Sequence, residues 1–299
     1  MRLLISAAIL AYLASRIDMR AAVAAVIAVD RWYLAAVLAL VALDRVVMIA
    51  RWVLLLRASR AQITTSSAAR IFLISSFVGS FLPAGVGGDA ARAYGLSRAT
   101  DAGDEAIASV VVDRLLGVLS LVAMAVVGLV AWTPATAAEW RFLVAVGVVA
   151  MVCLGAFWAD RLLVWSPARD YSGRGLLHSV VLAISRYRGY GHVLAHVMAW
   201  SLIVQLLRIA QAYLLGLGLG LNVPFRYYLL FMPIGLLMLL LPVSISGFGL
   251  PQGVIVWLLR PMNVPDERSF ALSTLIVLTG LAGNLPGLVL WLRRRREIL

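Results

Sequence analysis

The residues with the clearest chemical capacity in this sequence are charged side chains within strongly apolar stretches. A guanidinium group can hold a phosphate through two parallel hydrogen bonds, and a carboxylate can pair with arginine or carry a proton. A charge inside a membrane costs about 2.5–3.5 kcal/mol on insertion scales, so each such residue needs a partner or a function. The embedded arginines outnumber the embedded aspartates: they are Arg45, Arg51, Arg92, Arg114 and Arg208, against Asp44, Asp89 and Asp113.

Two of the aspartates directly precede an arginine, as Asp44–Arg45 and Asp113–Arg114. Adjacent residues point to different faces of a helix, so each is expected to pair across helices. Such ion pairs can serve only to hold a helix bundle together. The same residues can instead act on a substrate, with Asp44, Asp89 and Asp113 as candidates for proton or ion coupling. The sequence leaves both interpretations open.

A glycine-rich interruption at 81–92, Phe-Leu-Pro-Ala-Gly-Val-Gly-Gly-Asp-Ala-Ala-Arg, is the second feature with chemical capacity. Its outline returns at 241–247 as Leu-Pro-Val-Ser-Ile-Ser-Gly. Four positions match at a constant offset of 159 residues: Pro83 with Pro242, Gly85 with Ser244, Gly87 with Ser246 and Gly88 with Gly247. Paired breaks in long apolar segments indicate a transporter binding site built from interrupted helices.

Each interruption is suited to cradle a phosphate. Helices are expected to begin after Gly88 and after Gly249, with unpaired N–H groups and the positive end of the dipole at the turn. Asp89 is then either the N-cap of its helix or a proton-sensitive gate, and Arg92 can grip the phosphate together with an arginine across the bundle, Arg51 or Arg208. The predicted binding residues are Pro83, Gly85, Gly87, Gly88, Asp89, Arg92, Arg51, Arg114, Arg208, Pro242, Ser244, Ser246, Gly247, Gly249 and Gln252.

The sequence predicts no cofactor, metal site or catalytic residue. The single cysteine, Cys153, lies in an apolar run, and the histidines His178, His192 and His196 have no cysteine or acidic residue nearby. His192 and His196 are four residues apart on one helix face, but without a third ligand a structural role is expected.

The composition specifies the kind of protein that must position these residues. With 63% hydrophobic and 13% charged residues, the chain is too apolar for a soluble globular protein. We expect an all-α polytopic membrane protein forming a single transmembrane domain over residues 1–299. The net charge of +12 comes from arginines near span ends, which favours an anionic lipid surface over nucleic acid as the partner.

The apolar segments predict about six spanning helices and two re-entrant helical hairpins. Segment 3–29 is either one tilted span or a span followed by an interfacial helix. The other predicted spans are 32–56, 106–132, 142–158, 193–215 and 270–292. The hairpins have short arms on either side of each interruption, at 70–81 and 89–96 and at 226–241 and 250–259.

The distribution of arginine predicts the orientation. The Arg-rich loop 160–188 and the tail 293–296 are expected to be cytoplasmic, as are both termini. The first hairpin then enters from the cytoplasm and the second from outside. This makes repeat one, about 32–132, and repeat two, about 193–292, an inverted pair joined by span 142–158.

Three stretches of this sequence resemble a known family, the lysylphosphatidylglycerol synthase transmembrane region, also described as flippase-like. They are Leu82-Pro-Ala-Gly-Val-Gly-Gly-Asp-Ala-Ala-Arg92, Ser109-Val-Val-Val-Asp-Arg-Leu-Leu-Gly117 and Leu241-Pro-Val-Ser-Ile-Ser-Gly-Phe-Gly249. The resemblance implies lipid flipping across a cell membrane. In fused relatives a soluble aminoacyl-transferase domain follows; this sequence ends at Leu299, so lysyl transfer is not expected. One departure is Gln252, where the family usually has glutamate.

The leading hypothesis is a transporter of the cell (inner) membrane that moves an anionic phospholipid or a polyprenyl-phosphate-type lipid. The alternatives are a membrane-embedded enzyme that processes lipid phosphates, and a non-transporting partner subunit or small-ion channel. The expected partners are membrane lipids, with either a second copy of the chain or a separate lipid-modifying enzyme beside it.

Overall fold

The computed structural model describes residues 17–59, 63–82, 86–100, 103–132, 187–238 and 249–296. These residues are helical almost throughout. The helices are α2 (Met19–Ile27), α3 (Arg31–Ala58), α4 (Thr65–Gly79), α5 (Val86–Ala99), α6 (Gly103–Ala131), α9 (Gly191–Gly218), α10 (Phe225–Met238), α11 (Leu250–Leu259), α12 (Asp266–Ala282) and α13 (Leu285–Arg296), with short 3-10 turns at Arg188–Tyr190 and Arg260–Met262.

Four helical segments are long and apolar enough to cross a membrane, and they coincide with four of the predicted spans. They are Arg31–Ala58, Glu105–Ala131, Gly191–Gly218 and Asp266–Arg293. The predicted all-α, multi-pass membrane protein is therefore confirmed. The predicted segments 142–158 and 160–188, and residues 3–16 of the predicted first segment, lie outside the described residues.

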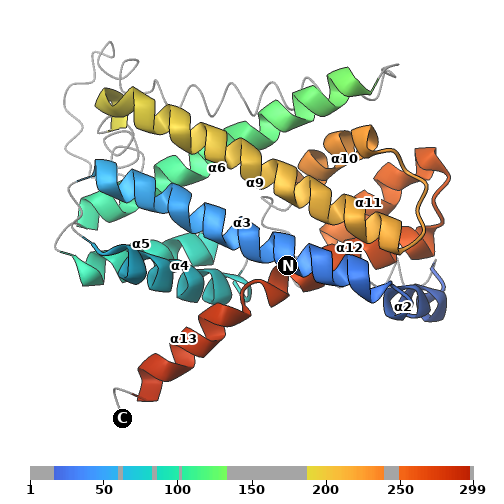
Figure 1. Ribbon diagram of the computed structural model, residues 1–299, viewed down its shortest axis with the longest axis horizontal. Helices are drawn as coiled ribbons and strands as arrows, with labels where there is room; N and C mark the ends of the chain where they lie inside the picture. The colour runs from blue at the N-terminus through green and yellow to red at the C-terminus, as the bar shows by residue number, and fades with distance from the viewer. Residues whose placement is uncertain are drawn as a thin grey trace, which may run out of the picture.

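Helices α3 and α9 pack closely against each other and run in opposite directions (Figure 1). Near one end of the pair the Tyr187 hydroxyl donates to the carbonyl of Leu55 at 3.2 Å. At the other end, Gly218 lies against Tyr33, where an added Cβ would come within 3.2 Å of the Tyr33 Cβ. The pair therefore stays in contact over nearly its full length.

Helices α4 and α5 pack against each other, as do α10 and α11. Each is 10 to 15 residues long. At 1.5 Å per residue this is about 15–23 Å, shorter than the roughly 30 Å hydrocarbon core. These helices therefore have the length expected of arms that enter the membrane without crossing it.

The predicted start of α5 is wrong by three residues. The helix begins at Val86, so Gly88 and Asp89 lie inside its first turn and Asp89 is not the N-cap. Gly88 serves a different purpose, because a Cβ on the facing Gly79 would lie only 2.6 Å from the Gly88 Cα. The glycines thus allow α4 and α5 to approach closely. The start of α11 agrees with the prediction, with Gly249 as its N-cap at φ 104°.

The two helical pairs also contact the spans in matching ways. Helix α10 packs against α6, and α4 packs against α13; α5 packs against α6, and α11 against α12. The contacts of α10 with α6 and of α4 with α13 each depend on a glycine. A Cβ on Gly128 of α6 would collide with the carbonyl of Leu229 in α10, and a Cβ on Gly287 of α13 would collide with the carbonyl of Leu73 in α4.

The ends of the bundle differ from simple spans. Helix α2 is a separate short helix whose N-cap, Asp18, accepts the N–H groups of Arg20 and Ala21 at 2.9 and 3.1 Å. The last span is broken between Ala282 and Leu285, just before Pro286, and α13 leaves the bundle at an angle to α12 (Figure 1).

Candidate functional site

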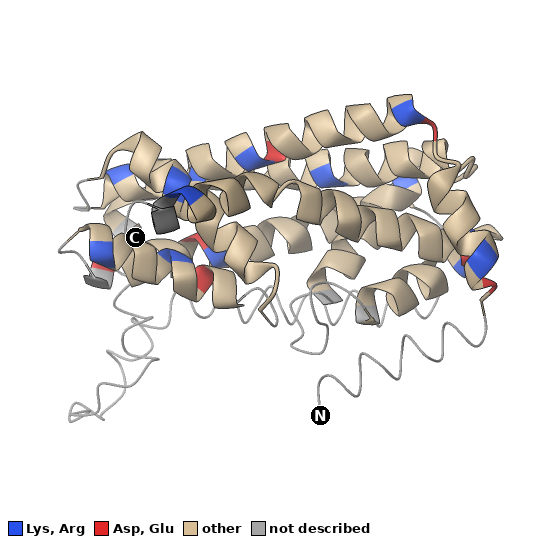
Figure 2. Cartoon of the chain, turned by 90° about the horizontal axis from the view of Figure 1, so that it is seen from below, with Lys and Arg blue, Asp and Glu red and all other residues tan. Residues whose placement is uncertain are grey.

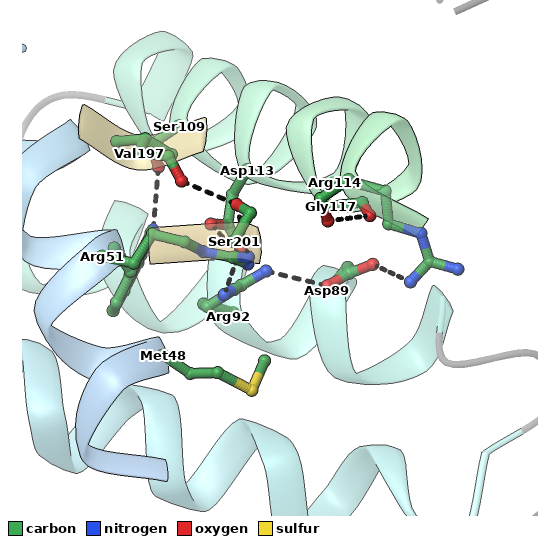
Figure 3. A network of polar contacts seen from close by, with 12 residues as sticks. Met48, Arg51, Asp89, Arg92, Ser109, Asp113, Arg114, Gly117, Val197 and Ser201 are labelled. Atoms are coloured by element: carbon green, nitrogen blue, oxygen red, sulfur yellow. Dashed lines mark hydrogen bonds and ion pairs between the residues drawn. The ribbon is translucent and has the colours of Figure 1, made fainter. Parts of the chain in front are cut away.

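The most buried charges of the bundle meet at Asp113 of α6. Its carboxylate forms ion pairs with Arg51 of α3 at 2.8 Å and with Arg92 of α5 at 3.1 Å (Figure 3). The exposed fractions of the three residues are 2, 4 and 5%. A helix of the first helical pair is therefore tied by charge to two spans, deep within the protein.

This network continues toward a more open region through Arg92. The second Nη of Arg92 pairs with Asp89 at 2.9 Å, and the other oxygen of Asp89 pairs with Arg114 at 2.6 Å. The Asp89 and Arg114 side chains are 23 and 34% exposed. The five residues, called the hairpin network below, thus extend from a buried end at Arg51 to an accessible end at Arg114.

Neighbouring side chains fix the arginines in place. Ser201 of α9 accepts a hydrogen bond from Arg51 at 2.9 Å and itself donates to the carbonyl of Val197. The Arg92 guanidinium lies 5.3 Å from the ring centroids of both Trp52 and Phe72, which is within cation–π range. These contacts hold the donors in one orientation.

The other two embedded arginines, Arg45 and Arg208, pair with Asp44 of α3, away from the hairpin network. Asp44 pairs with Arg208 of α9 at 3.2 Å and with its neighbour Arg45 at 3.4 Å, and Arg45 donates to the carbonyl of Gly280 at 3.3 Å. Figure 2 shows charged residues along the helices as well as at their ends. Arg208 therefore does not meet Arg92; of the two partners predicted for Arg92, the structure places Arg51 beside it.

The expected pairing across helices is confirmed for Asp113 and Arg114, whose partners come from other helices. It is only half right for Asp44, which pairs both across helices and with the adjacent Arg45. The Cα–Cβ bonds of adjacent helical residues point in different directions. The arginine side chain is nevertheless long enough to bend back along the helix and reach the carboxylate of its neighbour.

Several predicted site residues fall outside the described part of the chain, namely Pro83, Gly85, Pro242, Ser244, Ser246 and Gly247. Gly87 and Gly88 lie in the first turn of α5, one turn before Arg92. That the two interruptions face each other remains a prediction.

At the start of α11 the structure explains the role of Gln252. Its side-chain oxygen accepts the N–H of Gly249 at 2.6 Å, and the residue is fully buried. A glutamate carboxylate could accept the same bond. The departure from the family pattern therefore preserves the cap while removing a charge.

Three contributors were missed from the sequence: Ser201, Trp52 and Met48. Ser201 is seven residues before Arg208 and so lies on the same face of α9, a spacing that could have identified it. The other two look like ordinary apolar residues of a span, and only the tertiary contacts show that they touch guanidinium groups.

Among the described residues, no group of three His, Cys, Asp or Glu side chains is arranged to hold a metal.

Comparison with known proteins identifies the family. A search of curated proteins finds none that matches the chain. The family model described as the lysylphosphatidylglycerol synthase TM region matches residues 1–287, nearly the whole length. The apolar spans and the buried arginine–aspartate network are thus those of a chain that belongs to the lysylphosphatidylglycerol synthase transmembrane-region family.

Proposed function

We propose that this protein is a transporter, not an enzyme, that moves a phosphate-bearing anionic lipid across the cell (inner) membrane. The observation that carries the proposal is the hairpin network, in which Arg92 of a short helix shares Asp113 with Arg51 of a span. Arginine forks match phosphate oxygens, and a family named for a lipid makes a lipid phosphate the natural ligand.

The network suggests how a phosphate enters. The two carboxylate oxygens of Asp89 pair with Arg92 and Arg114, so both guanidinium groups have a carboxylate partner in this state. A phosphate that arrives at the accessible end can replace the Asp89 carboxylate and accept bidentate hydrogen bonds. Asp113 stays buried between Arg51 and Arg92 and remains their shared counter-charge. The lipid tails remain in the bilayer beside the protein.

We also propose that the chain is an inverted repeat, with α3–α6 as one unit and α9–α13 as the other. The antiparallel run of α3 and α9 supports it, as do the matching contacts of α10 with α6 and of α4 with α13. The close-contact glycines Gly128 and Gly287 are separated by 159 residues, the same offset that relates the two interruptions. Two units of opposite direction would let a phosphate bind from either side in turn.

The two helical pairs are then re-entrant hairpins. The first enters from the cytoplasm and the second from outside, with both termini cytoplasmic. Transport proceeds by alternating access, as the headgroup passes from one hairpin to the other. The short α4, α5, α10 and α11 helices support this arrangement, because none is long enough for the hydrocarbon core.

A flipping assay in vesicles tests the proposal. Purified protein is reconstituted in phosphatidylcholine vesicles that contain a trace of headgroup-labelled phosphatidylglycerol, and transfer between leaflets is followed by quenching of the outer label. We expect transfer with the native chain. With Arg92→Lys, which keeps the charge but loses the forked geometry, transfer should slow about tenfold, the loss of one charged hydrogen bond.

The matched control is Arg31→Lys, at the exposed start of α3, which should transfer lipid at the native rate. Native protein that moves no phosphatidylglycerol in either direction would contradict transport. Release of a free headgroup, seen by chromatography of the lipids, would favour the lipid-processing enzyme instead.

A further inference from the structure

A second arginine–aspartate cluster lies outside the hairpin network. It consists of Asp44 and Arg45 at the middle of α3 and Arg208 of α9, and is called the midspan cluster below. Asp44 pairs with Arg208 at 3.2 Å and with Arg45 at 3.4 Å. The Asp44 side chain is 4% exposed, whereas those of Arg45 and Arg208 are 17 and 27% exposed. The cationic side of the cluster is therefore reachable from outside the protein.

The midspan cluster holds more positive charge than negative. Among the residues that the structure describes, Asp44 is the only carboxylate that pairs with either arginine. Two guanidinium groups thus share one carboxylate inside an apolar bundle, where an unbalanced charge is costly. If its role were only to join α3 to α9, one arginine and one aspartate would suffice.

The two arginines also have donors to spare. Arg45 Nε is buried with no hydrogen-bond partner. Met48 Sδ accepts from Arg208 at 3.2 Å and from Arg45 at 3.6 Å, but a thioether is a weak acceptor. An anion with several oxygens would satisfy these donors better than the sulfur does.

The midspan cluster lies in line with the hairpin network. Asp44, Met48 and Arg51 are at positions i, i+4 and i+7 of α3, so they lie on one face of the helix. Seven residues correspond to about 10 Å along the helix axis. The two arginine clusters therefore lie at two depths along the same face of α3, with Asp44 and Arg51 both buried.

From this arrangement we infer that the midspan cluster is a second binding site for the phosphate of an anionic membrane lipid. It receives the headgroup near the middle of the bilayer after the headgroup leaves the hairpin network. The order in which the headgroup visits the two clusters rests on the proposed lipid transport. Binding at the midspan cluster itself can be tested without measuring transport.

The test is lipid binding to the purified full chain in detergent, with short-chain phosphatidylglycerol as the probe and native mass spectrometry as the readout. We expect Arg208→Gln to weaken one bound lipid about tenfold, the effect of losing a hydrogen bond from a charged group. Arg92→Gln should weaken a different one. The double variant Arg92→Gln/Arg208→Gln should weaken both bound lipids. Arg31→Gln removes a charge from the exposed end of α3 and should change neither affinity.

Asp44→Asn separates a phosphate site from a structural ion pair. It removes the competing carboxylate and raises the positive surplus, so a phosphate site should bind the lipid more tightly. Arg208→Lys, which keeps the charge, should retain more binding than Arg208→Gln. These two variants keep the test decisive even where Arg208→Gln fails to fold.

Equal weakening by Asp44→Asn and Arg208→Gln would overturn the inference and leave an ion pair. So would unchanged lipid binding in both variants, or Arg208-dependent binding of inorganic phosphate with none of the lipid. The proposed function fails in a different way: native protein that binds two lipids but transfers none would contradict transport and leave the midspan site standing.

Discussion

At the residue scale, the buried end of the hairpin network depends on how Arg51 and Arg92 share the carboxylate of Asp113. The sequence identified every arginine and aspartate of the hairpin network, because a charge in an apolar run is conspicuous. It did not identify the pairs. Whether Arg92 meets Arg51 or Arg208 depends on which helices pack together, and nothing local to Arg92 encodes that choice.

Removing the central carboxylate should be costly. Asp113→Asn leaves Arg51 and Arg92 facing each other without a shared counter-charge, and we expect the free energy of unfolding to fall by about 3–5 kcal/mol. The melting temperature of the purified protein in detergent measures this loss.

The control removes a positive charge together with the negative one. The double variant Arg51→Met/Asp113→Leu leaves Arg92 paired with Asp89 and should lose less stability than Asp113→Asn. A double variant at least as unstable as the single one would show that packing of the side chains, and not charge balance, sets the cost.

At the scale of the elements, the close contacts between helices depend on glycine. The sequence suggested that glycines mark breaks, and this holds for Gly249, which caps α11 at positive φ. It fails for Gly88, which lies within α5 and faces Gly79. Both uses of glycine look alike in sequence, because the distinguishing feature is a neighbouring helix far along the chain.

Two other glycines at close contacts between helices, Gly128 and Gly287, allow a direct comparison. Gly128→Ala and Gly287→Ala should each lower the free energy of unfolding by about 1–3 kcal/mol, because the new Cβ meets the backbone carbonyl of Leu229 or Leu73. Gly280→Ala is the matched control, since nothing lies within 4 Å of its added Cβ. It should leave stability unchanged or raise it by up to about 1 kcal/mol through helix propensity. Melting in detergent compares the three variants, and equal effects at all three positions would contradict the close-contact role.

At the scale of the whole molecule, composition and charge predicted a helical multi-pass membrane protein with four of its spans at the right places. The inverted arrangement was inferred from arginine asymmetry alone, and it remains a proposal about which side of the membrane each hairpin enters. Sequence periodicity cannot supply that information, since a span reads the same in either direction.

Labelling of single cysteines checks the orientation. In a Cys153→Ser background, Asn222→Cys lies in the exposed turn between α9 and α10, and Ala99→Cys at the exposed end of α5. A membrane-impermeant maleimide added to intact cells should label position 222 and leave position 99 unlabelled until the membrane is opened. Labelling of both positions from outside would contradict the inverted repeat.

The most direct test of the central claim is the ratio of transfer rates for two lipids in the same vesicles. Because both rates come from one preparation, the ratio does not depend on how much protein is correctly folded. If the arginine clusters hold an anionic phosphate headgroup, native protein should move labelled phosphatidylglycerol about tenfold faster than labelled phosphatidylcholine, and Arg92→Gln should bring the ratio close to one. Equal rates for the two lipids with the native protein would contradict the account.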